Sequence, residues 1–187
     1  MATAERIMRT HVNPDGSTVQ VPCDCSIGRG VTIGRYVVIC EKAVLGDRCQ
    51  VGQDCQIGAG AVVGRSAILK PNVKVGRNTR IASATTVCQK VNLGNGVALG
   101  LESYIGSHSA IGDGVEIGAY AHIGTGAIIA DSSWIGCRSV IGDDAEIPMK
   151  GTIVPERTVV AQRAFVINVD LQERALVVLS GQLPPGR

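Results

Sequence analysis

Histidine side chains are the best candidates for chemistry in this chain, which has only three of them, at positions 11, 108 and 122. An imidazole changes its protonation state near neutral pH, so a histidine in a groove can act as a general base that takes a proton from an amine or a hydroxyl. His108 lies in the segment Ile-Gly-Ser-His-Ser-Ala and His122 in Ala-Tyr-Ala-His-Ile-Gly. We therefore treat His108 and His122 as alternative catalytic residues.

The seven cysteines lack the spacing of a metal or redox motif. The closest pair, Cys23 and Cys25, is separated by one residue rather than by two. The histidines likewise lack a close pair of the kind that holds zinc. We predict reduced thiols and no metal site.

The elements that position these residues follow from a six-residue repeat. From Val21 to Ala164 the chain divides into 24 consecutive hexads, each beginning with Val, Ile or Leu, and 15 of them have Gly second. Such a fixed period is typical of repeat folds. The fifth residue is small from Cys25 through Gly151 and becomes Arg157 and Arg163 only in the last two hexads, where we expect the array to begin to close. On this count, no residue is inserted or deleted anywhere in the array.

The hexads predict an all-β fold, a parallel β-helix with no inserted loops. Side chains alternate along a strand, so the fifth residue of a hexad and the first of the next point inward, and the sixth points outward. Three hexads make a coil of 18 residues, and 24 hexads give eight coils. Cys25, Cys49 and Cys55 then fall at the inward fifth position and are interpreted as small core residues.

Residues 18 positions apart are vertical neighbours in such a fold. Thr86, Tyr104 and His122 form one outward column at the sixth position. Either this column is a subunit interface, or His122 acts as a base in the groove beside it. Two further columns, at turn positions, are predicted ion-pair ladders on the surface: Arg29, Asp47 and Arg65, and Glu102, Tyr120 and Arg138.

The repeat resembles that of the bacterial transferase hexapeptide-repeat family. In that family an aliphatic residue is followed by a position that is often Gly, two variable residues, a small residue and another variable residue. The resemblance covers residues 21–164. It implies that the helix is left-handed and that the chain forms a homotrimer. The outward faces of neighbouring prisms meet in such a trimer, so Tyr104, His122 and Trp134 are predicted to lie at the interface.

The resemblance to acyltransferases of this family also implies a function. An acyl group would pass from acetyl-CoA or another acyl-CoA, a cosubstrate that is not tightly bound, to a small amine or hydroxyl acceptor in a groove between subunits. His108 or His122 would be the base, and a backbone N–H would hold the thioester oxygen. The exit of the array, from Pro155 onward, resembles the close of such enzymes, although Gln162 stands where they have Gly.

Two departures from the family pattern favour a different function. The loop that usually closes over the acceptor is missing, and histidines are scarce. The alternative is a non-catalytic trimeric scaffold or assembly protein that organises partners. A detached form of the β-helical domain that follows sugar-nucleotide transferases is a third interpretation.

The two ends lie outside the repeat. Residues 1–20 form an N-terminal extension, and the turn sequence Asn13-Pro14-Asp15-Gly16 predicts a capping hairpin there. Residues 165–187 are expected to form strands or a second hairpin followed by a loose tail, with a helix as the alternative. A net charge of +2 with interspersed signs predicts neither a nucleic-acid nor a membrane partner. The N-terminus has no continuous apolar stretch, and we expect a cytoplasmic protein.

Overall fold

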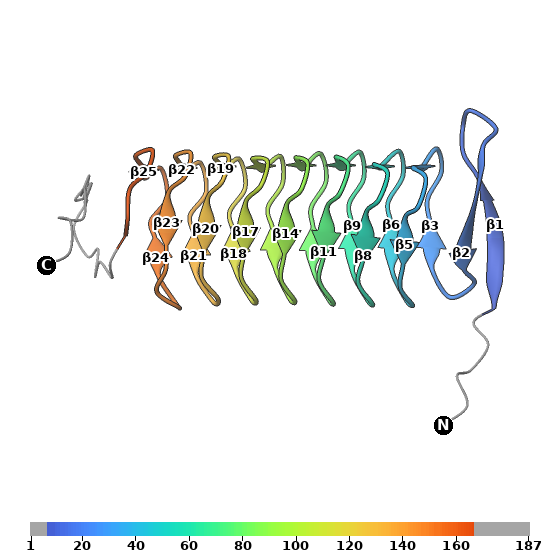
Figure 1. The fold of residues 1–187 in the computed structure, drawn as a ribbon, viewed down its shortest axis with the longest axis horizontal. Helices are drawn as coiled ribbons and strands as arrows, with labels where there is room; N and C mark the ends of the chain where they lie inside the picture. Colours follow the sequence, from blue (N-terminus) through green and yellow to red (C-terminus); the bar gives the residue numbers. More distant parts are fainter. Residues whose placement is uncertain (1–6, 167–187) are drawn as a thin grey trace, which may run out of the picture.

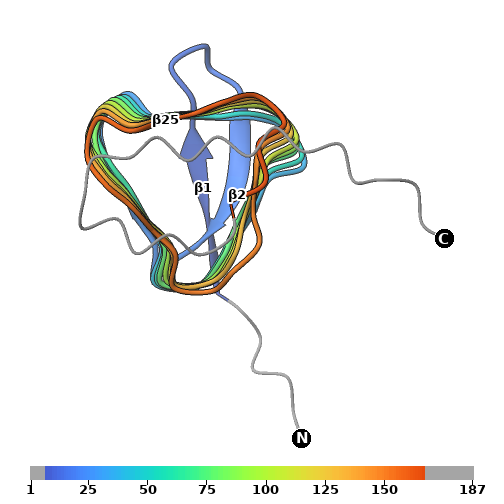
Figure 2. The same ribbon diagram turned by 90° about the vertical axis from the view of Figure 1, so that its left-hand side faces the viewer.

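The computed structural model describes residues 7–166. They form a long prism of stacked coils with a hairpin at its N-terminal end (Figure 1). Figure 2 shows that the coils are triangular and lie directly over one another. The predicted all-β, left-handed parallel β-helix of about eight coils is confirmed. Nothing in the described range forms a helix long and apolar enough to cross a membrane.

Each side of the prism is one parallel sheet, which we name after its first strand. The β3 face has eight strands: β3 (Ser26–Ile27), β6 (Val44–Leu45), β9 (Val62–Val63), β12 (Arg80–Ile81), β15 (Ala98–Leu99), β18 (Glu116–Ile117), β21 (Trp134–Ile135) and β24 (Ile153–Val154). The β4 face also has eight: β4 (Thr32–Ile33), β7 (Gln50–Val51), β10 (Ile68–Leu69), β13 (Thr86–Val87), β16 (Tyr104–Ile105), β19 (His122–Ile123), β22 (Val140–Ile141) and β25 (Val159–Val160). The β5 face has seven: β5 (Val38–Ile39), β8 (Gln56–Ile57), β11 (Lys74–Val75), β14 (Asn92–Leu93), β17 (Ala110–Ile111), β20 (Ile128–Ile129) and β23 (Glu146–Ile147).

Strands in each face pair in register with the strands one coil away. Ile68 on β10, for example, lies between Gln50 and Thr86, 18 residues away in each direction. The predicted vertical columns are therefore present. In the column of Glu102, Tyr120 and Arg138, however, the described contact is a cation–π contact of Arg138 with the Tyr120 ring (5.7 Å to the centroid) and not the predicted ion pair. Asp47 also joins its predicted column, because its carboxylate accepts a hydrogen bond from the backbone N–H of Arg29 (2.9 Å) and lies 3.8 Å from the guanidinium of Arg65.

The repeat contains one extra residue that the hexad count missed. The turn that follows β23 has an additional residue, so Trp134 pairs with Ile153, 19 residues away. Val154 and Val160 are buried, whereas Ile153 and Val159 are 58% and 52% exposed. The prediction of an uninterrupted period was wrong in the last two hexads. Both residues of the pairs Ile153-Val154 and Val159-Val160 are aliphatic, so either one could be counted as the first residue of its hexad.

The shifted frame explains the arginines at the end of the array. Arg157 and Arg163 occupy the fourth position, at the corner, with φ values of 58° and 57°. The inward fifth positions are held by Thr158, which is half-buried, and by buried Ala164. The array does not close at these arginines, because the coil continues to Phe165, which bridges to Glu146. The rest of the predicted C-terminal strands or hairpin lies outside the described residues.

The core consists of large aliphatic side chains at the first position and small ones at the fifth, including the predicted Cys25, Cys49 and Cys55. Hydroxyls at the fifth position bond to turn carbonyls, as Ser109 does with the carbonyls of Gly106 (2.9 Å) and Gly124 (2.8 Å). Ser103 is the exception in the described range, since its buried hydroxyl has no partner. Burial of an unpaired hydroxyl costs stability.

The predicted N-terminal hairpin is confirmed and covers the end of the prism. Strands β1 (Met8–Val12) and β2 (Thr18–Pro22) pair antiparallel. Asn13, at the turn, is buried, and its side chain donates to the carbonyl of Ile33 (2.9 Å) and accepts from the N–H of Ile33 (2.8 Å). Because β4 is the first strand of its face, these groups have no neighbouring strand on that side. Asn13 takes the place of the missing strand.

The cap predicts a specific loss in the variant Asn13→Ala. Leaving both Ile33 groups unpaired at a buried edge should lower the free energy of unfolding by about 2–3 kcal/mol. Gln20→Ala is the matched control, because Gln20 bonds only to Thr10 on the exposed side of the same hairpin. Denaturation midpoints at one protein concentration measure both effects, and equal losses in the two variants would contradict the role of Asn13.

From Gly30 to Asp144 the corners of the prism place the fourth residue of each hexad at positive φ, where a side chain is strained. Ala84 (φ 56°) and Gly96 (φ 65°) occupy this position at two corners. A Cβ on Gly96 would meet no atom within 4 Å, so only the backbone conformation opposes a side chain there.

The strain predicts opposite effects for two substitutions. Ala84→Gly should raise the free energy of unfolding by about 0.5–1 kcal/mol, because relief of strain exceeds the added chain entropy. Gly96→Ala should lower it by a similar amount, about 1 kcal/mol. Thermal midpoints of the two variants measure this, and a change of the same sign in both would overturn the explanation.

Candidate functional site

The strongest candidate site is the outward column on the β4 face. Thr86, Tyr104 and His122 are paired strand to strand, as predicted. The rings of Tyr104 and His122 stack with centroids 4.6 Å apart and planes 4° from parallel. This contact holds the imidazole flat against its neighbour while leaving His122 exposed. An exposed base in a fixed orientation is what proton transfer to a bound molecule requires.

Cys88 extends this column in a way that the sequence did not reveal. Its thiol lies 3.0 Å from the Tyr104 hydroxyl and forms a hydrogen bond with it. Hexad register places Cys88 on a turn, in a different column from Tyr104, so the register alone does not predict this contact. The signal that could have found the contact is the length of the tyrosine side chain, which reaches from its strand to the turn of the previous coil.

The contact with Cys88 changes the acidity of the tyrosine. It raises the pKa of Tyr104 above its ordinary value, with partial burial as the second cause. Electrostatic interactions with Cys88 and Asp143 add to the shift. Tyr104 is therefore neutral at physiological pH and supports His122 through its ring and a fixed hydroxyl.

His108 lies apart from this column. It occupies the corner between the β4 and β5 faces with φ 63°, and its backbone N–H donates to the carbonyl of Gln89 at 3.1 Å. It follows Lys90 one coil later in the same row of fourth-position residues along this corner. Among the contacts of residues 7–166, no hydrogen bond or ring contact joins His108 to His122. The two histidines are separate candidates and do not form a pair.

Trp134 lies on a different side of the prism from Tyr104 and His122. It continues the column of Arg80, Ala98 and Glu116 on the β3 face, as predicted, and is half-buried. The three predicted interface residues therefore lie on two faces of the prism, the β4 face and the β3 face.

Residues of the types that bind metal ions are scattered over the part of the chain that the structure describes. Across residues 7–166 no group of three or more His, Cys, Asp or Glu side chains converges. Burial raises the pKa of the Cys49 thiol to about 12. Cys49 therefore stays protonated at neutral pH and serves as a core residue.

No protein-family model matches the chain, and no curated protein matches it in sequence. Solved structures do match. PerB from Caulobacter crescentus, in complex with CoA and GDP-perosamine, is 18% identical, with 73% of this chain and 55% of PerB covered and a TM-score of 0.51. The common feature is the fold, a left-handed β-helix.

Other matches are more distant in shape. The acetyltransferase domain of PglB from Neisseria gonorrhoeae FA1090 is 21% identical to this chain, with a TM-score of 0.43. The match covers 75% of this chain and 52% of the PglB domain. UDP-N-acetylglucosamine O-acyltransferase (LpxA) from Moraxella catarrhalis RH4 is 13% identical, with coverage of 78% and 66% and a TM-score of 0.38. The chain spans about half the length of PerB and of the PglB domain.

The thiol contact predicts how Tyr104 titrates. Replacing Tyr36 and Tyr120 by Phe leaves Tyr104 as the single tyrosine. In that background the phenolate absorbance of Tyr104 should rise at a pH above the ordinary range of about 10. Adding Cys88→Ala should move the transition to lower pH, because it removes the largest cause of the raised pKa. An unchanged transition would show that the thiol does not control the hydroxyl.

Proposed function

We propose that the chain is an acyltransferase that moves an acyl group from acetyl-CoA or another acyl-CoA to a small amine or hydroxyl acceptor. The observation that carries the proposal is the stacked pair of Tyr104 and His122, an exposed base in a fixed orientation on a flat β face. PerB, solved with CoA and GDP-perosamine, has the same type of fold and supports this choice of cosubstrate. The acyl-CoA is a cosubstrate that binds and leaves in each cycle.

The reaction needs only the base and one hydrogen-bond donor. His122 takes the proton from the acceptor N–H or O–H as that atom attacks the thioester carbonyl. A backbone N–H stabilises the oxyanion of the tetrahedral intermediate. When the intermediate collapses, the C–S bond breaks and the imidazolium returns the proton to the departing CoA thiolate. His108 is the alternative base. Within residues 7–166, however, no hydrogen bond or ring contact of its side chain fixes the orientation of its imidazole.

A homotrimer completes the proposal. A groove between the β4 face of one subunit and a neighbouring subunit would shield His122 from water, a task that an inserted loop would otherwise perform. Trp134 on the β3 face would anchor the neighbour. We place the protein in the cytoplasm, where acyl-CoA is available and where the seven free cysteines would remain reduced.

The second candidate is a non-catalytic trimeric scaffold. The coils of residues 21–166 carry no inserted loop, and their outward positions include exposed apolar side chains such as Val38 and Ile128. Apolar side chains on an open surface favour contact with another protein. This function requires no affinity for CoA.

Binding separates the two candidates. Calorimetric titration of the trimer with acetyl-CoA should show micromolar binding near one site per subunit if the chain is an acyltransferase. Release of CoA thiol is then measured with a panel of amine and sugar acceptors. A trimer with no heat of binding would reject the acyltransferase and favour the scaffold.

Substitution of the base tests the mechanism. His122→Ala should lower turnover about 10²–10⁴-fold, the usual contribution of a general base. His108→Ala is the matched control and should retain turnover, and the mass of both variants in solution should remain that of the parent. Full activity in His122→Ala with loss in His108→Ala would transfer the role to His108, and activity in both would remove the mechanism.

The interface makes its own prediction. Trp134→Glu should dissociate the trimer, because a carboxylate would lose water on entering an apolar contact. Glu116→Gln, one coil away in the same column, is the control. Sedimentation equilibrium measures the masses, and an intact trimer in Trp134→Glu would place the interface elsewhere.

A further inference from the structure

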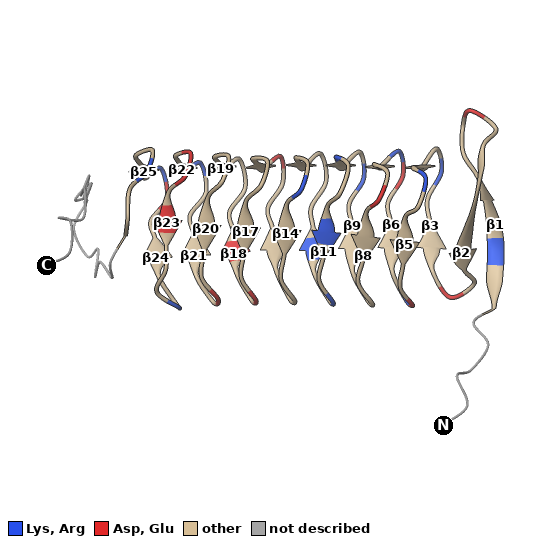
Figure 3. Cartoon of the chain, viewed as in Figure 1, with Lys and Arg blue, Asp and Glu red and all other residues tan. Residues whose placement is uncertain are grey.

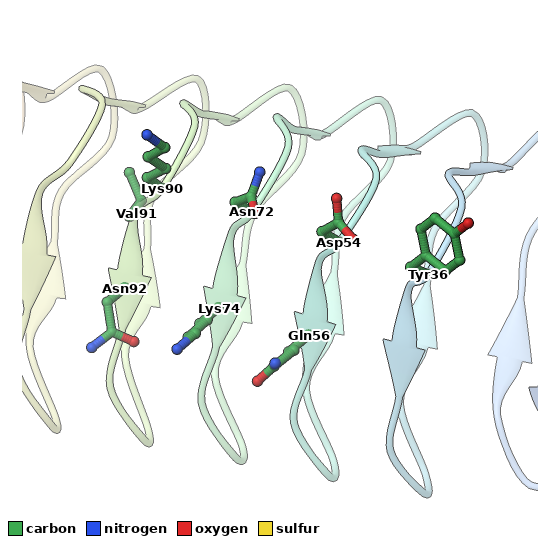
Figure 4. A pocket seen from close by; sticks show the side chains of 8 residues that line it. All are labelled: Tyr36, Asp54, Gln56, Asn72, Lys74, Lys90, Val91 and Asn92. Atoms are coloured by element: carbon green, nitrogen blue, oxygen red, sulfur yellow. The ribbon is translucent and has the colours of Figure 1, made fainter.

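A groove runs along the prism at the corner between the β4 and β5 faces (Figure 4). It has a volume of about 570 Å³, within the usual range of ligand sites. One wall is the corner row Tyr36, Asp54, Asn72 and Lys90. The other wall is the outward row of the β5 face, Gln56, Lys74 and Asn92, and buried Val91 belongs to the lining.

The groove is elongated and regular. Tyr36 and Lys90 are separated by 54 residues, which is three coils of 18. At the spacing of paired strands the lining therefore extends over about 14 Å, and successive side chains of one row lie ~4.8 Å apart. Figure 4 shows these side chains as two rows that follow successive coils, one along the corner and one along the β5 face.

Within residues 7–166 the polar side chains of this groove are free, whereas several acids and amides at the third position of other turns are not. Asn95, Asp113 and Asp131 each accept a backbone N–H from the previous coil. No such side-chain hydrogen bond or ion pair is found within residues 7–166 for the acids, amides and lysines that line the groove. Their hydrogen-bonding capacity is available to a bound molecule.

The charges differ between the two ends of the groove. Lys74 and Lys90 lie on its last two coils, and Figure 3 shows β11, the strand of Lys74, as a basic segment of the β5 face. Tyr36, at the other end, is 81% exposed and presents its ring to solvent. The groove thus has two cations at one end, amides and a carboxylate along its length, and an aromatic ring at the other end.

We propose that this groove binds an extended acidic oligosaccharide. Amide side chains donate and accept hydrogen bonds together, which suits the adjacent hydroxyls of a sugar ring. Asp54 accepts from hydroxyls, and the ring of Tyr36 packs against the C–H face of a terminal sugar. Lys74 and Lys90 bind the carboxylate of an acidic sugar. A purely anionic ligand would leave the amides and the tyrosine without a role.

This inference does not rest on the proposed acyl transfer. Binding of the sugar is measured without acyl-CoA, and a chain that lacks acyltransferase activity could still bind it. Failure of one proposal is therefore distinguishable from failure of the other.

The test is calorimetric titration of the full chain with trigalacturonate, with neutral galactotriose and triglutamate as comparison ligands. Trigalacturonate should bind near one site per chain, and more tightly than either comparison ligand. Its affinity should fall as salt is added, because exposed lysines are screened. No binding of trigalacturonate, equal affinity for galactotriose, or equal affinity for triglutamate would each overturn the proposal.

Variants locate the binding. Lys74→Gln and Lys90→Gln should each weaken the affinity for trigalacturonate about three- to tenfold, as expected for exposed charge-assisted contacts. Lys42→Gln is the matched control, because Lys42 has the same fourth hexad position and a positive φ like Lys90 but lies at the corner between the β5 and β3 faces, outside the groove. An equal loss in Lys42→Gln would show a general charge effect and overturn the site.

Discussion

The hydrogen bonds between neighbouring coils are the constraint on which the rest of the structure depends. The N–H of Gly46 donates to the carbonyl of Val63 at 2.7 Å, and similar bonds recur around every coil. They bring successive backbones to about 4.8 Å. A Cβ on Gly46 would lie 2.7 Å from the backbone N of Arg65, which explains why glycine is so common at the second position.

The same constraint organises the outer surface. Because strands one coil apart pair in register, side chains at the same position of successive coils lie beside one another along the axis of the prism. Tyr104 and His122 stack for this reason. For the same reason the carboxylates of Asp113 and Asp131 each accept a backbone N–H from the previous coil. The prism therefore gives side chains of modest length a rigid setting without a folded loop. Its sites are rows, and their chemistry depends on which residues follow one another at intervals of a coil.

Much of the fold was predictable from the sequence because the repeat is a local signal. The inward Cys49 and the outward His122 followed from hexad register alone. The extra residue before β24 was not predictable, since Ile153 and Val154 are both aliphatic and only packing decides which one is buried. The contacts of Cys88 with Tyr104 and of Asn13 with Ile33 depend on side-chain reach and on the ends of the prism, which a period does not encode.

The hairpin at the N-terminal end has a consequence for assembly in the direction of the axis. A stack of parallel coils ends in strands whose backbone groups could pair with the end of another molecule, and repeated pairing of that kind produces filaments. Asn13, Arg9 and His11 already bond to backbone groups of the first coil, at Ile33, Cys25 and Val31. The hairpin therefore occupies backbone groups through which another prism would otherwise add at the N-terminal end, and it disfavours end-to-end growth there.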